Sequence, residues 1–148
     1  MADGTVYFDS ALVAKFYLNE PGREALRELA RQAGRVVSSG IAVAEISAAF
    51  HRKLREGALE QAVFKALCGQ FAHDLKGGLW TLIPVTDVLL EDVRALFTRL
   101  GPAVYLRSVD ALHLVTAKAE HLDRVYSNDR HLLKACSATG LKGINPIA

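Results

Sequence analysis

Two acidic residues directly follow short apolar runs of the chain. Asp9 comes after residues 6–8, and Asp129 comes after a second run that ends near Ser127. Asp is a favoured N-cap, so each residue also has an ordinary role at the start of a helix. If both runs are strands of one parallel sheet, however, the two carboxylates lie at the same edge, where ligands bind in open α/β sheets.

Two further acids, Asp110 and Glu45, lie in segments with helical periodicity. Asp110 opens an apolar helix, where an acid also complements the helix dipole, and Leu114 follows it one turn later. Glu45 has Ala48 and Ala49 one turn further on, so we expect a mid-helix carboxylate on a buried face rather than a cap. Because a buried carboxylate is costly without a counter-charge, Glu45 is expected to pair either with a buried Arg or Lys or with a metal ion.

A cluster of carboxylates without cysteine suits Mg²⁺ or Mn²⁺ better than zinc. Such an ion polarises a phosphoryl oxygen and lowers the pKa of a bound water, which is the chemistry of phosphodiester hydrolysis. We expect the four carboxylates to lie within about 5 Å of one point and, without metal, to raise one another's pKa.

A glycosidase would need an aromatic cleft, and the single Trp80 lies in an apparent core strand. A phosphoryl-accepting Asp9 would need a second Asp two residues on, where Ala11 stands.

Runs of β-branched and aromatic residues alternate with amphipathic helical segments along the chain. This alternation predicts parallel strands joined by right-handed crossovers, hence a three-layer α/β fold with a short, mostly parallel sheet of four to five strands. Ser108 is expected to cap the most apolar helix. Strands are expected over residues 6–8, 35–38, 79–85, 124–127 and 143–145, and helices over residues 11–18, 21–33, 41–55, 58–75, 87–100, 108–120 and 129–138.

Composition is that of a globular protein, with 148 residues, 51% hydrophobic and 23% charged, and a net charge of +2. The near balance of charge excludes a uniformly basic surface for binding nucleic acid but is compatible with a local basic groove. No apolar run reaches the roughly 18 residues of a membrane span, and the chain shows no secretory signal pattern. Cys68 and Cys136 lack zinc-ligand spacing. We therefore expect a cytoplasmic protein, with residues 1–148 forming a single domain and no membrane partner.

Stretches along nearly the whole chain resemble PIN-domain ribonucleases of the VapC toxin type. The opening Val6-Tyr7-Phe8-Asp9-Ser10-Ala11, with the turn Asn19-Glu20-Pro21-Gly22, resembles the start of that family. Ala44-Glu45 follows, then Arg107-Ser108-Val109-Asp110-Ala111-Leu112-His113 and Tyr126-Ser127-Asn128-Asp129-Arg130-His131, and finally Gly140-Leu141 with Asn145-Pro146. Each motif is weak alone, but four acids in this order are fairly specific.

The resemblance implies a PIN-like fold and a Mg²⁺- or Mn²⁺-dependent endoribonuclease that acts as the toxin of a toxin–antitoxin pair. Asp9, Glu45, Asp110 and Asp129 would hold the metal and activate water, with Ser127 as an accessory polar residue. The expected partners are single-stranded or looped RNA, a second copy of the chain in a homodimer, and a small antitoxin. In that family the C-terminal segment of the antitoxin blocks the site and its N-terminal part binds operator DNA.

Each residue near these acids could have an ordinary structural role or a functional one. Ser10 is expected to cap a helix or to take a second role at the metal, and His113 is either a core histidine or a neighbour of the site. Lys15 and Arg107 are the expected RNA contacts because each lies close in sequence to a site acid, although solvated surface charge is the ordinary alternative. The alternative function is a non-catalytic PIN-like module that binds RNA or an Arg-bearing protein.

Overall fold

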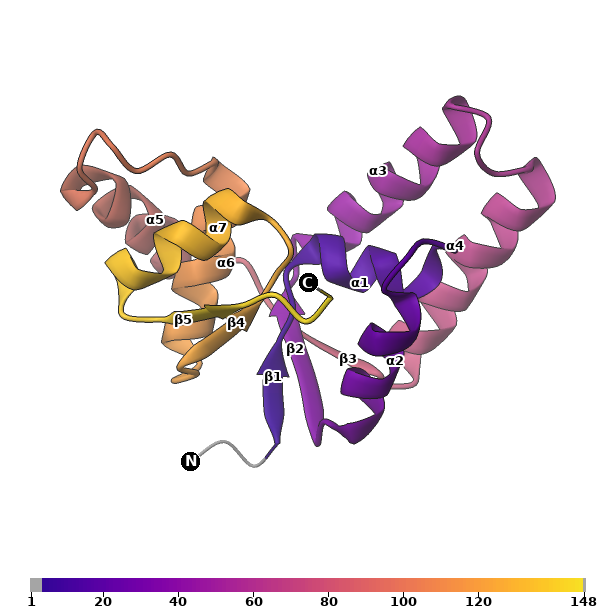
Figure 1. Cartoon of the computed structure of the whole chain (residues 1–148), viewed down its shortest axis with the longest axis horizontal. Helices are drawn as coiled ribbons and strands as arrows, with labels where there is room; N and C mark the ends of the chain where they lie inside the picture. The colour runs from indigo at the N-terminus through magenta and orange to yellow at the C-terminus, as the bar shows by residue number, and fades with distance from the viewer. Residues whose placement is uncertain (1–3, 148) are drawn as a thin grey trace.

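The computed structural model describes residues 4–147. Strands and helices alternate along the chain as the sequence predicts (Figure 1). The strands are β1 Thr5–Tyr7, β2 Arg35–Ser39, β3 Trp80–Ile83, β4 Arg124–Tyr126 and β5 Lys142–Ile144. The helices are α1 Ser10–Tyr17, α2 Arg23–Gln32, α3 Ala42–Arg55, α4 Gln61–Lys76, α5 Asp87–Arg99, α6 Ser108–Ala119, α7 Arg130–Cys136 and the 3₁₀ turn η1 Ser137–Thr139.

The strands pair in parallel, in one group of three and one group of two. β2 lies between β1 and β3, with Val6 opposite Val36, and β4 pairs with β5. A single parallel bridge between Phe8 and Tyr126 joins the two groups, and the backbone N–H of Asp9 donates to the carbonyl of Tyr126 at 3.2 Å. The strand order is therefore β3-β2-β1-β4-β5, with all five strands parallel, and the carboxyl ends of β1 and β4 meet beside Asp9.

Helices cover the sheet on both faces, so the fold has three layers. Helices α1 to α4 lie on one side and α5 to α7 on the other, as Figure 1 shows. Neighbouring strand residues point to opposite faces, and accordingly Tyr7 joins the core beneath α5 to α7 while Phe8 joins the core beneath α1 to α4. Val37 and Val36 of β2 divide in the same way. The predicted three-layer α/β fold is confirmed.

Local chemistry explains most helix boundaries. Asp9 and Asp129 cap α1 and α7, and Thr86 caps α5 by accepting from the Leu89 N–H. Gly22 precedes α2 with φ of 95°, where an added Cβ would also lie only 3.0 Å from Ile147. The predicted cap Ser108 is wrong, because it is the first residue of α6 and no side chain caps that helix.

Helix α6 is the central element of one layer, with each residue from 110 to 117 buried. Its burial fixes where Asp110 and His113 lie relative to the strands. In the described range 4–147, no helix has the length and apolar character required to cross a bilayer.

Candidate active site

The four acidic residues line one small cavity at the carboxyl edge of the sheet. The cavity has a volume of about 60 Å³, and Asp9, Glu45, Asp110 and Asp129 all contribute to its wall. They come from the end of β1, the first turn of α3, the first turn of α6 and the N-cap of α7. Residues separated by up to 120 positions are thus brought to one place by the parallel pairing of β1 with its neighbours. Ser10, Ala11, Arg107 and His113 complete the lining.

Asp9 and Asp129 each serve as a helix cap and as a site residue. In Asp9, Oδ1 accepts from the Leu12 N–H at 3.0 Å, while Oδ2 accepts from the Ser127 hydroxyl at 2.6 Å. In Asp129, Oδ1 accepts from the N–H groups of His131 and Leu132 at 2.8 and 3.2 Å, and Oδ2 accepts from Arg107. One oxygen of each carboxylate therefore satisfies a helix end, and the other belongs to the site.

Ser127 connects these two aspartates. Its hydroxyl donates to Asp9 Oδ2 and accepts from the backbone N–H of Asp129 at 3.0 Å, and the residue is completely buried. A buried hydroxyl with both donor and acceptor satisfied holds its neighbours in one arrangement. Ser127 thus sets the position of the Asp9 carboxylate relative to the start of α7.

Arg107 is the cation closest to the cluster. Its Nε donates to Asp110 Oδ2 at 3.0 Å, and its Nη2 donates to Asp129 Oδ2 at 2.9 Å. The arginine side chain is 59% exposed, whereas that of Asp110 is only 10% exposed. Arg107 therefore reaches in from the surface and partly neutralises two of the acids.

Glu45 departs from the expected buried, mid-helix position. Helix α3 begins at Ala42, so Glu45 lies in its first turn, and its side chain is 36% exposed. Its partner is neither Arg nor Lys: Oε1 lies 3.4 Å from Nε2 of His113. The expected buried face is wrong because Ala48 is exposed and Ala49 is only half-buried, beside a cavity that Glu45 also lines.

His113 is a buried part of the site wall and is 1% exposed. Its Nδ1 lies 2.7 Å from the hydroxyl of Tyr7, and its Nε2 lies 3.0 Å from the hydroxyl of Ser10. Ser10 is the first residue of α1 and is directed to His113, while Asp9 provides the cap. The imidazole therefore joins β1, α1 and α3 through polar contacts. The sequence did not identify Tyr7 as a partner of His113, because a tyrosine in a strand is expected to be an ordinary core residue.

The acids do not share one electrostatic environment. Burial raises the pKa of Asp9, and the opposing effects of His113 and of the Ser127 hydrogen bond do not cancel it. Burial also raises the pKa of Asp110 in spite of Arg107. For Glu45, burial is outweighed by hydrogen bonds from His113 and Ser10, so its pKa is lowered. The expected mutual rise is therefore wrong for Glu45, and for the two aspartates desolvation is the main cause.

The donor set has the chemistry of a hard divalent-cation site, since the four acids supply only carboxylate oxygens. Within the described part of the chain, however, no three Asp, Glu, His or Cys side chains are arranged as ready metal ligands. Asp9 Oδ2 is engaged by Ser127, and Asp110 and Asp129 meet at Arg107. The residues fit such a cation provided that the exposed Arg107 moves away.

The expected RNA contacts lie in different settings. Arg107 borders both the acid cavity and an adjoining one of about 260 Å³, which Arg52 also lines. Lys15 lies outside both linings: its side chain is 16% exposed and pairs with Glu20 at 3.4 Å. Arg52, in the last turn of α3, is thus better placed beside the acids than Lys15.

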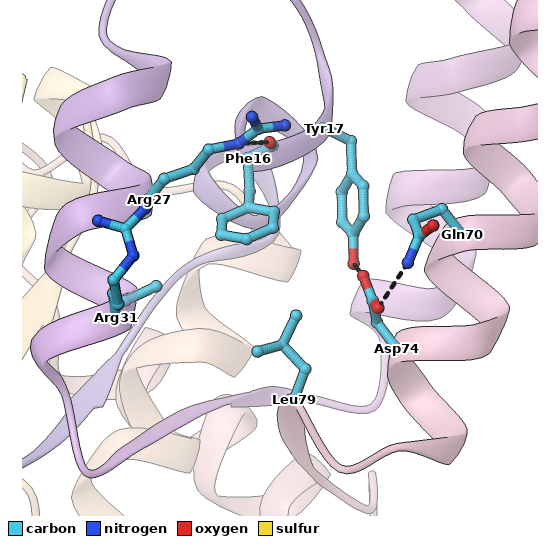
Figure 2. Close-up of a pocket in the computed structure, with 8 residues that line it drawn as sticks. Phe16, Tyr17, Arg27, Arg31, Gln70, Asp74 and Leu79 are labelled. Atoms are coloured by element: carbon cyan, nitrogen blue, oxygen red, sulfur yellow. Dashed lines mark hydrogen bonds between the residues drawn. The ribbon is translucent and has the colours of Figure 1, made fainter.

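A larger cavity of about 580 Å³ lies at the opposite end of α1 and is shown in Figure 2. Its single carboxylate, Asp74, accepts hydrogen bonds from Tyr17 at 2.6 Å and from Gln70 at 2.9 Å. The indole N–H of Trp80 donates to the same Tyr17 hydroxyl, so Trp80 belongs to the core as expected. With one acid that is already engaged, this cavity lacks the groups that hydrolysis requires.

The chain is similar to known proteins over most of its length. The family model for the PIN domain matches residues 6–137. The chain is 31% identical to Ribonuclease VapC46 of Mycobacterium tuberculosis over 144 residues, which cover 95% of this chain and 97% of the relative.

Solved structures share the fold at low sequence identity. FitAcB from Neisseria gonorrhoeae superposes with a TM-score of 0.71 at 16% identity, covering 95% of this chain and 97% of its own. VapC20 of M. tuberculosis, described as a Sarcin-Ricin loop cleaving toxin, gives 0.70 at 16% identity and covers 95% and 99%. A toxin–antitoxin complex from Klebsiella pneumoniae gives 0.64 at 12% identity and covers 95% and 97%.

Proposed function

The chain belongs to the PIN-domain family, and from this membership we propose that it is an endoribonuclease, the toxin of a toxin–antitoxin pair. One observation carries the proposal: four carboxylates from four separate elements line one cavity, in a chain similar over 95% of its length to a ribonuclease. The reaction is hydrolysis of an RNA phosphodiester bond by a water activated in that cavity.

We propose that Asp9, Glu45, Asp110 and Asp129 hold Mg²⁺ or Mn²⁺. When bound, such an ion supplies Lewis-acid polarisation of the phosphoryl oxygen and acidifies a coordinated water. The capping oxygens fix Asp9 and Asp129 in place, and their second oxygens, which contact Ser127 and Arg107, are the ones that would face the ion. Preorganised groups of this kind need little rearrangement during the reaction.

The remaining site residues position these acids and receive the substrate. Ser127 holds Asp9, and His113 with Ser10 holds Glu45 on the other side of the cavity. Arg107 exchanges its two carboxylate partners for a phosphate of the RNA, to which a guanidinium can donate two hydrogen bonds.

The substrate we propose is single-stranded or looped RNA, because bases in such RNA are free to be read by a protein. The protein partner we propose is an antitoxin, in line with the toxin–antitoxin complex among the structural neighbours.

We also propose a homodimer. Support comes from three exposed apolar side chains near the starts of α3 and α5, namely Val43, Val85 and Val88. The segments before these helices adjoin, since the Gly40 N–H donates to the carbonyl of Ile83 at 2.8 Å. Light scattering of the purified protein tests this assembly, and a monomeric mass would contradict it.

Cleavage of RNA by the purified chain tests the proposed activity. We expect cleavage that requires Mg²⁺ or Mn²⁺, stops with EDTA and falls by several orders of magnitude in Asp110→Asn. Asp92→Asn is a matched control, because Asp92 is an exposed aspartate on α5 and does not line the acid cavity. Cleavage unaffected by EDTA would contradict the metal-dependent mechanism. RNA binding without cleavage would instead favour the non-catalytic module.

A further inference from the structure

The segment between α5 and α6 presents an aromatic ring beside the acid cavity. Leu106 is 8% exposed and Val104 packs against the same core, whereas Tyr105 between them is 58% exposed. Burial alternates along this segment, with Val104 and Leu106 covered and Tyr105 and Arg107 exposed. The core contacts of its neighbours therefore direct Tyr105 toward solvent.

Tyr105 is supported by a second ring. The centroids of Tyr105 and His131 are 4.6 Å apart, and their planes meet at 72°. His131 is the second residue of α7, and its backbone N–H donates to Asp129 Oδ1 at 2.8 Å. The supporting ring therefore belongs to a residue whose backbone is hydrogen-bonded to a site acid.

Arg107 connects this segment of the chain to the acids. Its guanidinium donates to Asp110 and Asp129, and it is two residues from Tyr105 along the chain. An exposed aromatic ring, a cation and a set of carboxylates thus follow one another across a short stretch of surface.

This order matches the chemistry of a nucleotide in a single strand. Aromatic side chains stack on the faces of unpaired bases, and arginine binds the phosphate that follows. A T-shaped contact covers at most one face of Tyr105, and the 58% exposure of this residue leaves ring surface available for stacking.

We propose that Tyr105, supported by His131, is a stacking platform for one base of the RNA next to the phosphate that is cleaved. The inference rests on the proposed ribonuclease function and adds a substrate-positioning residue to it. Tyr105 acts by binding the base and takes no part in proton transfer.

Binding of a labelled RNA tests the platform separately from catalysis. In an Asp110→Asn background, we expect Tyr105→Ala to weaken binding of a fluorescein-labelled, mixed-sequence single-stranded 12-mer RNA by about fivefold to a hundredfold. Tyr105→Phe keeps the ring and should remain within about twofold of the parent, since stacking uses the ring face. Phe97→Ala removes another exposed aromatic residue, on α5, and should leave binding unchanged.

Two further readouts distinguish stacking from a structural role. With Asp110 intact, Tyr105→Ala should raise KM far more than it lowers kcat, while Tyr105→Phe restores KM. RNA carrying 5-iodouracil should photo-crosslink to Tyr105 or His131.

The outcomes separate this inference from the proposed function. If the wild type cleaves RNA and Tyr105→Ala has an unchanged KM, the platform is refuted and the ribonuclease stands. If the wild type neither binds nor cleaves RNA, both are refuted. If Tyr105→Ala loses binding to a co-expressed antitoxin while RNA binding is unchanged, the ring belongs to a protein interface instead.

Discussion

Asp129 offers a direct test of whether one side chain serves both stability and catalysis. Its Oδ1 caps α7, and its Oδ2 pairs with Arg107 at 2.9 Å. Asp129→Ala removes both interactions, whereas Asp129→Asn keeps a capping oxygen and loses only the ion pair. The two variants therefore separate the cap from the charge.

The magnitudes follow from the two contacts. Loss of an N-cap costs about 1 kcal/mol, and an ion pair whose side chains are 59% and 26% exposed contributes only about 0.5 kcal/mol. Asp129→Ala should thus lower the free energy of unfolding by about 1.5 kcal/mol, which is about 4–5 °C in Tm for a chain of this length. Asp129→Asn should lower Tm by at most about 2 °C.

Thermal unfolding in EDTA, followed by circular dichroism, measures the stability, and RNA cleavage with Mg²⁺ or Mn²⁺ measures the activity. Both variants should lose cleavage by several orders of magnitude because both remove a site carboxylate. Equal Tm values for the two variants would show that Oδ1 does not stabilise α7. A higher Tm for Asp129→Asn than for the wild type would show that repulsion among the acids outweighs the Arg107 pair. Full activity of Asp129→Asn would remove Asp129 from the site.

Burial, charge and the carboxylate lining of the cavity allow four other tests. Burial raises the pKa of Asp9 in the folded state, so the folded protein binds more protons and loses stability as the pH rises above the usual Asp value. Without metal, Asp9→Asn should therefore gain stability relative to the wild type between about pH 4 and pH 7. Glu45→Gln should instead lower stability above about pH 5, because the lowered pKa of Glu45 adds stability there, and the difference from the wild type should shrink as the pH falls toward about 3. Urea unfolding from about pH 3 to pH 7 checks both signs. Mn²⁺ should raise the Tm of the wild type by mass action and that of Asp110→Asn much less, and an equal rise would place the ion elsewhere. In the native protein, iodoacetamide should alkylate Cys68 and spare Cys136, because Cys136 is 1% exposed and burial raises its pKa to about 11. Mass spectrometry measures the labelling, and labelling of both cysteines would show that α7 opens readily.

The fold class could be predicted from the sequence because it depends on short-range patterns. Alternating strands and helices of limited length have few parallel arrangements, so the three layers follow from the order of elements. The caps at Asp9 and Asp129 could likewise be predicted from the local sequence, since a cap is a contact over three residues. Boundaries were less accurate: the fourth helix begins at Gln61, three residues later than expected, and the third strand ends at Ile83.

The convergence of the four acids could be predicted, but their interactions could not. The sequence by itself determined that Asp9 and Asp129 follow strands and that Asp110 begins a buried helix, since each is a property of its own segment. Only the tertiary structure decided that Arg107 bridges Asp110 and Asp129 and that Glu45 faces His113 from a half-open position. Those pairings join residues up to 68 positions apart. Such contacts depend on how layers pack and how much solvent each side chain retains, and no periodicity within a single segment carries that information.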